Sequence, residues 1–335
     1  MSKAILVTGG LGYIGSHTVV ALANQGYIPV IIDNLSNTTQ EVLNRLQTIT
    51  KQELPCYIGD VRNTQLLSSI FEKHKPQAVI HFAAFKAVGE SVEQPLKYYN
   101  NNVTGLLNLL SVMQEQSCNK LVFSSSCTVY GQPEQLPVSE SAPMVKPESP
   151  YGNTKKICEE ILMDLSTVQS IALRYFNPIG AHASALIGEL PLNVPNNLVP
   201  YITQTAAGLR TALTIHGNDY PTPDGTCIRD YIHVEDLADA HILALEFLVQ
   251  NPKPFDVFNI GTGTGYSVNE VVQTFEKVNN LSLPYQYGPR RPGDVIQVWA
   301  DPGKAMKQLG WKPKETLQSM LSSAWKWQCA LSAGE

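Results

Sequence analysis

The stretch "VTGGLGYIG" (Val7–Gly15) joins a short apolar run to a segment with helical character. Three glycines, Gly9, Gly12 and Gly15, recur within it at intervals of three residues. Because glycine has no Cβ, the backbone here can turn tightly and approach a ligand closely. The N–H groups at the start of the following helix attract phosphate. A strand, a glycine turn and a helix in this order predict a site for the pyrophosphate of a dinucleotide.

Apolar runs of similar length repeat along the first half of the chain, separated by segments with helical periodicity. They span residues 4–8, 28–33, 55–59, 78–84, 121–126 and 171–177. Runs this continuously apolar suit strands that are buried on both faces of a parallel sheet. The alternation of strand and helix therefore predicts an α/β fold of the Rossmann type, with a doubly wound parallel sheet.

The character of the sequence changes after residue 177. Residues 178–200 are rich in proline, glycine and asparagine, which is typical of loops that leave a sheet. We predict a dinucleotide-binding domain at 1–177 and a second, smaller α/β domain at 178–335. A predicted helix at 230–249 and a predicted strand at 255–261 indicate that residues 229–261 return to the first domain.

The composition excludes several classes of partner. The 335 residues carry a net charge of −5 without a basic run, so neither nucleic acid nor an anionic membrane surface is an expected partner. No apolar run approaches the ~18 residues of a membrane span, and the first strand starts too early for a signal peptide. The six cysteines form no C-x-x-C pair, and the histidines show no metal-ligand spacing. Free thiols predict a cytoplasmic protein without a metal site.

Two aspartates after predicted strands indicate which dinucleotide binds. Asp33 ends the second apolar run, eighteen residues after Gly15. A carboxylate there accepts hydrogen bonds from the ribose hydroxyls and repels a 2′-phosphate, which favours NAD over NADP. Asp60, in "GDVRN" (residues 59–63), is placed to reach the adenine edge.

The stretch "SPYGNTK" (Ser149–Lys155) reads as the start of a helix, with Ser149 as N-cap and Pro150 in the first turn. Tyr151 and Lys155 then share one helix face. A nearby ammonium lowers the pKa of a phenol from ~10 and lets it serve as a general acid/base. The same spacing also fits two solvated residues on an ordinary amphipathic helix.

Several longer motifs carry a resemblance to a known family. They include "SSSCTVYG" (124–131), "LRYFNPIGAH" (173–182), "PNNLVPYI" (195–202) and "PRRPGD" (289–294). With the glycine spacing and the Tyr-x-x-x-Lys pair, they resemble the UDP-glucose 4-epimerase family of the extended short-chain dehydrogenase/reductase superfamily, over almost the whole chain. The resemblance implies NAD as a tightly bound cofactor and a UDP-sugar as substrate.

The resemblance also implies three catalytic residues. Tyr151 is the acid/base at the sugar 4-hydroxyl, and Lys155 lowers its pKa and holds the nicotinamide ribose. Ser126 hydrogen-bonds the reacting oxygen, with assistance from Thr128. Taken alone, Ser126 is better explained as a strand-end serine that caps the backbone, but its place one strand-to-helix unit before Tyr151 favours the catalytic role.

The implied binding residues fall into two sets. The cofactor set is Gly9, Gly12, Tyr13, Ile14, Gly15, Asp33, Asn34, Asn37, Thr38, Asp60, Val61, Phe82, Ala83, Lys86, Asn101, Ser126, Tyr151, Lys155 and Tyr175. The substrate set is Ser126, Tyr151, Asn177, Asn196, Asn197, Leu198, Thr214, His216, Arg229, Tyr231, Arg291, Asp294 and Val298. Val61 and Phe82 also suit a hydrophobic core. Two arginines suit a diphosphate, because guanidinium forks onto phosphate oxygens. His216 stands where many relatives carry phenylalanine, and an imidazole there can still stack on the uracil.

The implied reaction inverts the sugar C4 through a 4-keto intermediate and so interconverts UDP-galactose and UDP-glucose. Val298 stands where strict relatives carry tyrosine, so the N-acetylated sugars UDP-GalNAc and UDP-GlcNAc are further candidate substrates. A homodimer joined through helices near 91–116 and 151–169 is expected from the family.

Two alternatives explain some of the same residues. A nucleotide-sugar 4,6-dehydratase shares the first step, but its relatives place an Asp-Glu pair where this chain has Cys127 and Thr128. A non-catalytic NAD-binding regulator typically lacks the tyrosine or the lysine, and this chain has both.

Overall fold

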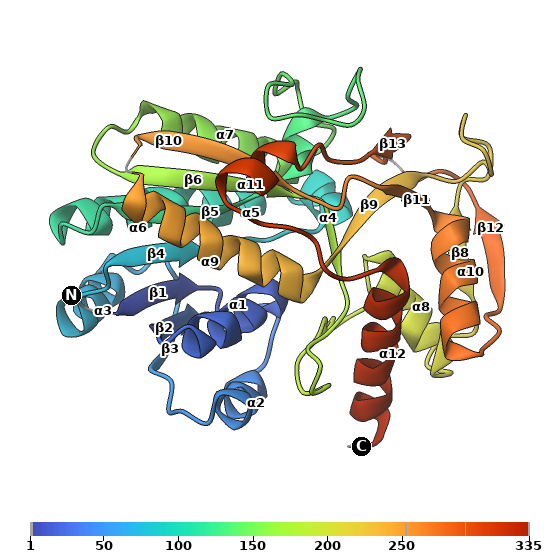
Figure 1. Cartoon of the computed structure of the whole chain (residues 1–335), viewed down its shortest axis with the longest axis horizontal. Helices are drawn as coiled ribbons and strands as arrows, with labels where there is room; N and C mark the ends of the chain where they lie inside the picture. The colour runs from blue at the N-terminus through green and yellow to red at the C-terminus, as the bar shows by residue number, and fades with distance from the viewer. Residues whose placement is uncertain (1–2, 252, 292, 334–335) are drawn as a thin grey trace.

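A computed structural model describes residues 3–251, 253–291 and 293–333. Its centre is a seven-stranded sheet in the order β10-β6-β5-β4-β1-β2-β3, and every neighbouring pair is parallel (Figure 1). The strands are β1 (Ala4–Thr8), β2 (Ile28–Asp33), β3 (Cys56–Ile58), β4 (Ala78–His81), β5 (Lys120–Ser126), β6 (Gln169–Tyr175) and β10 (Phe255–Ile260). The prediction of a doubly wound α/β sheet is confirmed.

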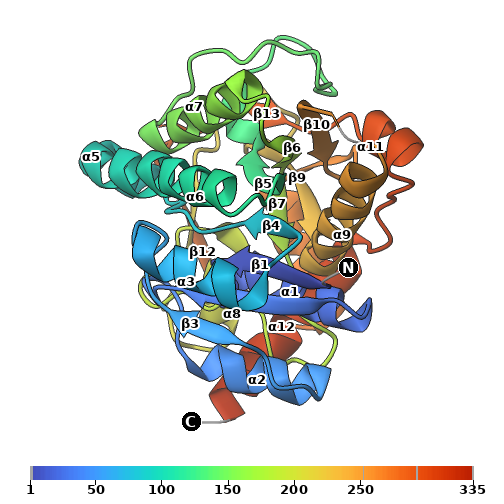
Figure 2. The ribbon, with the colours of Figure 1, turned by 90° about the vertical axis from the view of Figure 1, so that its left-hand side faces the viewer.

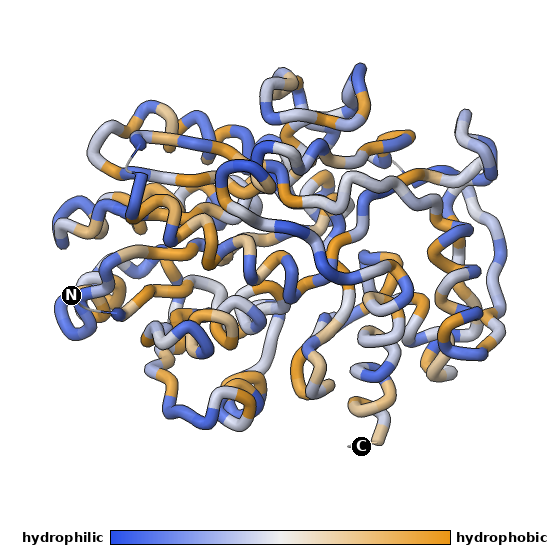
Figure 3. Tube along the Cα trace, in the orientation of Figure 1, coloured by the Kyte–Doolittle hydropathy of each residue, from blue (hydrophilic) through white to orange (hydrophobic). Residues whose placement is uncertain are grey.

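Helices cover both faces of this sheet (Figure 2). One face packs on α1 (Tyr13–Asn24) and α9 (Val234–Gln250), with α2 (Glu41–Thr50) at its margin. The other face packs on α3 (Thr64–His74), α6 (Thr104–Glu115) and α7 (Pro150–Asp164). Hydrophobic residues follow the central strands (Figure 3), because each strand contributes side chains to two separate cores.

Two short helices and a π-helical turn lie between β4 and α6. They are α4 (Val88–Glu93), α5 (Pro95–Tyr98) and η1 (Tyr99–Val103). A single 3₁₀ turn, η2 (Cys127–Tyr130), follows β5.

Smaller sheets form beside the large one, and we call them with their helices the small-sheet region. Strand β9 (Ile228–His233) pairs with β7 (Asn177–Ile179), β11 (Gly265–Ser267) and β13 (Gln297–Val298). Strand β8 (Leu213–His216) pairs with β12 (Tyr285–Gly288). Helices α8 (Leu198–Ala206), α10 (Val268–Asn279) and α12 (Leu317–Ala333) pack around a third core in this region.

The chain returns to the large sheet after β9. Helix α9 packs on α1, β5 and β6, and β10 extends the sheet beyond β6. Helix α11 (Gly303–Gln308) packs on β10. These contacts agree with the direction of the predicted return, while the domain division at residue 177 itself remains a prediction.

The predicted helix at 230–249 is wrong in its first four residues, Asp230–His233. These residues belong to β9, where they are buried and pair with β7 and β11. The helix starts only at Val234, because His233 is the N-cap and its ring nitrogen accepts from the N–H of Glu235. In the part of the chain that the structure describes, no helix is long and apolar enough to cross a membrane.

Candidate active site

The predicted site residues of the large sheet gather at one edge. Since all seven strands are parallel, the segments that follow β1, β2, β4, β5 and β6 leave the sheet at the same carboxyl edge. Ligands bind at this edge in open α/β sheets.

The glycine turn connects β1 to α1, and its geometry requires glycine. Gly9 has a φ of +69°, in the left-handed region. A Cβ on Gly15 would lie 2.1 Å from the carbonyl oxygen of Gly9, so no side chain fits there. Gly12 is the N-cap of α1 and brings no side chain to cap the helix N–H groups. The turn is therefore a backbone-lined cradle that suits a phosphate.

Asp33 fixes this cradle to the next turn. Its two carboxylate oxygens accept from the N–H of Leu11 at 3.0 Å and the N–H of Leu35 at 2.9 Å. Burial raises the pKa of Asp33, and the backbone hydrogen bonds oppose that shift. A carboxylate accepts more than two hydrogen bonds, so Asp33 retains capacity for ribose hydroxyls.

The loops after β2 and β3 carry four further residues of the cofactor set. Thr38 donates to a backbone carbonyl of the glycine turn at 2.8 Å, and Asn37 is exposed. The side chain of Asn34 donates to Asp60 at 3.0 Å. Asp60 also accepts a two-pronged contact from Arg62, which holds the pKa of Asp60 well below its usual range.

The segment after β4 closes over the glycine turn. A Cβ on Gly9 would meet the backbone nitrogen of Ala83 at 2.9 Å, so the two segments need this glycine to approach. Phe82 packs against the core beside α1 and α9. Lys86 makes an ion pair with Glu189 at 2.9 Å.

Three more residues of the cofactor set make contacts within the protein itself. The hydroxyl of Tyr13 donates to the carbonyl of Gly180 at 2.7 Å. Ile14 packs beside one core, and Val61 is buried in the other. Val61 therefore packs as a core residue, in agreement with its alternative interpretation.

Asn101 and Tyr175 lie on either side of β5. Asn101 is buried in η1 and donates through Nδ2 to Asn102 at 3.0 Å. Tyr175 ends β6, and its hydroxyl is hydrogen-bonded to the hydroxyl of Ser124.

The helix predicted from "SPYGNTK" is present as α7. Ser149 is its N-cap and accepts from the N–H of Gly152 at 3.2 Å, and Pro150 occupies the first turn. Tyr151 lies close enough to Ser126 for the serine hydroxyl to affect its pKa. Burial raises the pKa of Tyr151 to about 12, while the Ser126 hydroxyl acts in the opposite direction.

Ser126 caps the backbone, as one of its two interpretations predicts, while its hydrogen bond to the reacting oxygen stays a prediction. Its Oγ accepts from the N–H of Thr128 at 3.3 Å and so caps η2, and it also meets the Tyr151 phenol. The hydroxyl of Thr128 is buried, and within the described residues it has no hydrogen-bond partner.

In this structure Lys155 is not among the groups that shift the pKa of Tyr151, so the lowering expected from it stays a prediction. Nζ of Lys155 donates to the carbonyl of Ser124 at 2.6 Å and lies 4.9 Å from the ring centre of Phe123. Burial lowers the pKa of Lys155 to about 8. The ammonium donates to the β5 backbone in this structure, and burial is the main cause of the raised pKa of the phenol.

The charged residues of the substrate set cluster in the small-sheet region. Arg291 contacts both carboxylate oxygens of Asp294, at 3.2 and 2.9 Å, and donates to the carbonyl of Asn196 at 3.1 Å. Nη2 of Arg229 lies 3.8 Å from the same carboxylate. Two cations therefore converge on one anion, which leaves net positive charge for a diphosphate.

Other substrate-set residues lie on the strands around this cluster. Asn177 of β7 is paired in register with Tyr231 of β9. Val298 of β13 is paired with Arg229 of β9, and it is buried in a core with Val129 of η2.

The remaining members lie at α8 and β8. Asn197 is the N-cap residue of α8 and donates through its amide to Glu189 at 2.6 Å, while Leu198 begins the helix. Thr214 and His216 lie on β8, away from the sheet edge that carries Tyr151.

Two acidic residues at the site were not predicted. Glu189 contacts both Lys86 and Asn197, but its loop has no periodicity that could have indicated this. Glu159 is fully buried and paired with Arg174. Its position four residues after Lys155, on the buried face of the same helix, was a usable signal.

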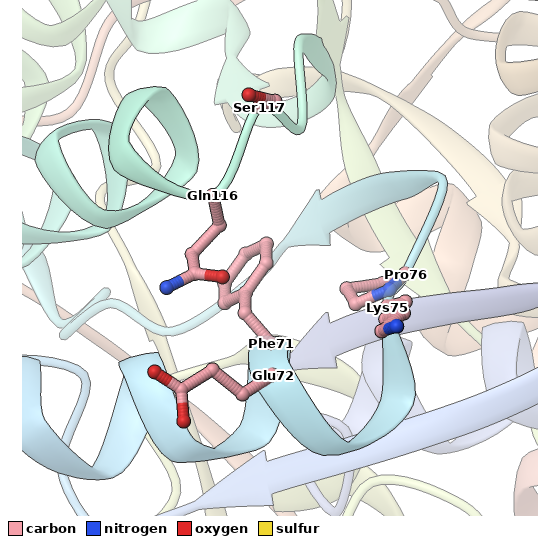
Figure 4. A pocket seen from close by; sticks show the side chains of 6 residues that line it. All are labelled: Phe71, Glu72, Lys75, Pro76, Gln116 and Ser117. Atoms are coloured by element: carbon pink, nitrogen blue, oxygen red, sulfur yellow. The ribbon is translucent and has the colours of Figure 1, made fainter.

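A hollow of about 550 Å³ lies at the opposite edge of the sheet, where α3 and α6 lead into β4 and β5 (Figure 4). It is lined by Phe71, Glu72, Lys75, Pro76, Gln116 and Ser117. None of the predicted site residues is among them. Across the described residues, no group of three or more histidine, cysteine or acidic side chains could hold a metal ion.

Comparisons with known proteins bear on the same site. The family model for GDP-mannose 4,6 dehydratase matches residues 6–324. The UDP-glucose 4-epimerase of Bacillus subtilis is 53% identical over 329 residues, which cover 97% of this chain and 96% of that protein. The UDP-glucose 4-epimerase of Dictyostelium discoideum is 52% identical and covers 97% of this chain and 95% of its own.

Solved structures agree with these sequences. A Stenotrophomonas maltophila UDP-glucose 4-epimerase, with bound NAD and formylated UDP-arabinopyranose, superposes with a TM-score of 0.96 at 46% identity, over 99% of each chain. A Bifidobacterium longum UDP-glucose 4-epimerase, in complex with NAD+ and UDP, gives a TM-score of 0.95 at 43% identity, over 99% of this chain and 100% of its own. Within the wider set that the dehydratase model matches, this chain belongs to the UDP-glucose 4-epimerase family.

Proposed function

We propose that the protein interconverts UDP-galactose and UDP-glucose, with NAD as a tightly bound cofactor, through a 4-keto sugar intermediate. The observation that carries this proposal is that Tyr151, at the start of α7, lies beside Ser126, at the carboxyl end of β5, on the same sheet edge as the glycine turn. A proton-transfer group and a dinucleotide cradle at one edge suit redox chemistry on a bound alcohol.

The residues present fit NAD. The glycine turn is held in a tight path by the close approach of Gly15 to the carbonyl oxygen of Gly9, and it offers backbone N–H groups to a pyrophosphate. Asp33 is placed to accept from ribose hydroxyls, and Lys155 to donate to the second ribose. When bound, NAD supplies the acceptor and donor of hydride at the sugar C4.

The protein's own groups manage the proton and the position of the sugar. Tyr151 takes the proton from the 4-hydroxyl and later returns it, and Ser126 holds the same oxygen. Burial raises the pKa of Tyr151 to about 12, so Tyr151 must first lose its own proton before it can accept one from the 4-hydroxyl. The positive charges of Lys155 and of bound NAD+ would favour that phenolate. The 4-keto sugar must turn about its link to the diphosphate, so that hydride returns to the opposite face and C4 is inverted.

Arg229 and Arg291 hold the diphosphate during that turn, because a forked guanidinium suits phosphate oxygens. Asp294 lies between the two arginines and is placed to receive uridine ribose hydroxyls once they engage the phosphates. The sugar would be free to rotate while the diphosphate stays fixed.

The rival dehydration needs an acid to eliminate the C6 hydroxyl. Cys127 and Thr128 occupy that place, and burial raises the pKa of the Cys127 thiol to about 12. Such a thiol is a poor proton donor beside a sugar. The observation therefore favours epimerisation over 4,6-dehydration.

The experiment is to incubate pure protein with UDP-galactose or UDP-glucose, without added NAD, and to separate the products. Interconversion is expected, because a resident cofactor ends each cycle in its starting state. A 4-keto-6-deoxy product would favour the dehydratase instead. Release of NAD(H) on acid denaturation, near one per chain, is the accompanying expectation.

We also propose a homodimer joined through α4 to α7. Four large apolar side chains are exposed on these helices: Val92, Leu96, Leu107 and Met163, with Leu96 81% exposed. Such a patch commonly marks a protein interface. Light scattering should give a molar mass of twice the chain mass for the wild type. The Leu96→Asp variant should give the mass of a single chain. The six cysteines, all free, further suit a reducing cytoplasm.

A further inference from the structure

Asp230 is a buried carboxylate that the proposed mechanism does not use. It lies on β9 between Arg229 and Tyr231, two residues of the substrate set. Its side chain has no exposed surface. The ion pair of neighbouring Arg229 is made with Asp294, so in the described structure Asp230 is held by hydrogen bonds. A buried charge is costly unless such bonds satisfy it.

Four donors satisfy the two oxygens of Asp230. Oδ1 accepts from the N–H of Thr262 at 2.8 Å and from its hydroxyl at 2.6 Å. Oδ2 accepts from the N–H of Gly263 at 3.0 Å and from the N–H of Ala300 at 3.1 Å. Three of the donors are backbone groups, so this carboxylate fixes the path of the chain rather than one side chain.

The donors come from two distant segments. Thr262 and Gly263 directly follow β10, the edge strand of the seven-stranded sheet. Ala300 lies two residues after Val298, beyond β13 of the small-sheet region. Asp230 therefore joins the end of the large sheet to two strands of the small-sheet region at one point.

Gly261 supports this arrangement independently. A Cβ on Gly261 would lie 2.6 Å from Oδ2 of Asp230 and 2.7 Å from the Cβ of Ala300. The backbone after β10 therefore comes so close to the carboxylate that only glycine fits.

We call the contacts of Asp230 with Thr262, Gly263 and Ala300 the junction. It lies next to residues that the proposed function assigns to substrate binding. Arg229 and Tyr231 flank Asp230 on β9, and Val298 and Asn177 are the ladder partners of these two neighbours. If the junction loosens, the diphosphate arginine and the residue beside the sugar lose their fixed spacing.

We propose that Asp230 is a positioning residue of the nucleotide-sugar site, which sets Arg229 and Val298 relative to the seven-stranded sheet. The inference rests on the proposed function for the identity of the ligand. It assigns Asp230 no contact with the substrate and no part in proton transfer.

The test is Asp230→Asn in the full chain, with UDP as the binding probe. The amide has nearly the same shape but turns one acceptor into a donor, which then faces an N–H or hydroxyl donor. We expect the Kd for UDP and the KM for UDP-galactose to rise roughly tenfold, which matches the cost of one unsatisfied buried hydrogen bond. The kcat and the NAD(H) content should stay within about twofold of the wild type.

Asp236→Asn is the matched control. Asp236 is also buried and accepts two backbone N–H groups, from Lys314 and Glu315, but it lies on α9 away from the substrate set. It should lower thermal stability without changing UDP affinity. If the Asp230 and Asp236 variants differ only in stability, or if Asp230→Asn lowers kcat and NAD(H) content with UDP affinity intact, the positioning role is overturned.

A milder variant covers the case in which Asp230→Asn does not fold. Thr262→Val removes one of the four donors and keeps the shape, and it should weaken UDP binding about twofold to threefold, while Thr262→Ser should restore it. Unchanged UDP affinity in Thr262→Val would then overturn the inference. Wild-type protein that binds UDP but interconverts no sugar would refute the proposed function alone, because the UDP titration still decides the role of Asp230.

Discussion

The glycine turn and the arginine cluster, formed by Arg229, Arg291 and Asp294, are both proposed to bind phosphate groups. They differ in how their polar groups are held. In the glycine turn the polar groups are backbone N–H groups, fixed by β1, α1 and the carboxylate of Asp33. In the arginine cluster the cations sit on flexible side chains and are already engaged, since Arg291 grips Asp294 and Arg229 lies 3.8 Å from it.

Because of this difference, the two sites should be sensitive to different kinds of substitution. The cradle is preformed, so binding there depends on shape and fails when atoms are added. The arginine cluster must exchange a carboxylate for a phosphate. An exposed ion pair contributes only about 0–1 kcal/mol, so the exchange is inexpensive and depends on charge.

Tyr151→Phe tests whether both regions serve a reaction that lies between them. Turnover should fall ~10²–10⁴-fold or more, because the hydroxyl that carries the proton is gone. NAD(H) content and UDP affinity should stay at wild-type levels, since the ring keeps its packing. Rates close to wild type, measured by product separation, would remove Tyr151 from the mechanism.

Gly15→Ala should break the cradle. The new Cβ would have to lie 2.1 Å from the carbonyl oxygen of Gly9, so the turn must open. We expect protein that is nearly free of NAD(H) after purification, with activity reduced in proportion. Gly89→Ala in α4 is the control for loss of a helical glycine, because a Cβ there meets nothing within 4 Å. Equal NAD(H) content in both variants would contradict the shape argument.

Asp33→Ala should have a smaller effect on the same cradle. It removes the acceptor predicted for the ribose and the anchor of the Leu11 N–H, but it leaves the glycine path open. NAD(H) occupancy should fall by roughly tenfold or less at low cofactor concentration, and added NAD should restore it. Unchanged occupancy in titrations would exclude Asp33 from the cofactor site.

Arg291→Ala should affect the arginine cluster and not the glycine turn, because it removes a positive charge. UDP affinity should fall roughly tenfold, as expected for loss of a charge-assisted hydrogen bond, while NAD(H) content stays constant. Arg290→Ala is the matched control, because the neighbouring Arg290 pairs with Asp219 instead. A similar loss in both variants would indicate a general surface-charge effect.

Val298→Tyr should have the smallest and most selective effect. We expect measurable activity of the wild type on UDP-GalNAc, because valine leaves room for an acetamido group, and its selective loss in the tyrosine variant. Val298 is buried in a core with Val129, however, so a tyrosine must find space toward the sugar. If kcat/KM falls equally for UDP-galactose, the variant reports overpacking and position 298 does not select the sugar.

The large sheet was predictable because its strands are buried on both faces. The bounds of β1 and β2 match the apolar runs at 4–8 and 28–33, since every residue there except Ile28 is buried. The helix start at Ser149 was equally readable, because capping is decided within four residues.

Other features depend on distant partners and could not be predicted. Residues 230–233 have the apolar pattern of a helix, but pairing with β7 and β11 makes them a strand. The direction of the Lys155 ammonium depends on a carbonyl of Ser124, 31 residues away. A spacing of four residues fixes a shared helix face, but it does not say which neighbour the side chain meets.

The order of the elements along the chain has a consequence for engineering. The chain leaves the large sheet after β6, returns with α9 and β10, leaves for β11, returns with α11 and ends in α12 of the small-sheet region. No contiguous stretch of the gene therefore encodes either part. A chimaera that joins the first half of one relative to the second half of another must cut through both. Sugar selectivity in this scaffold cannot be exchanged as a cassette, and it has to be rewritten one position at a time.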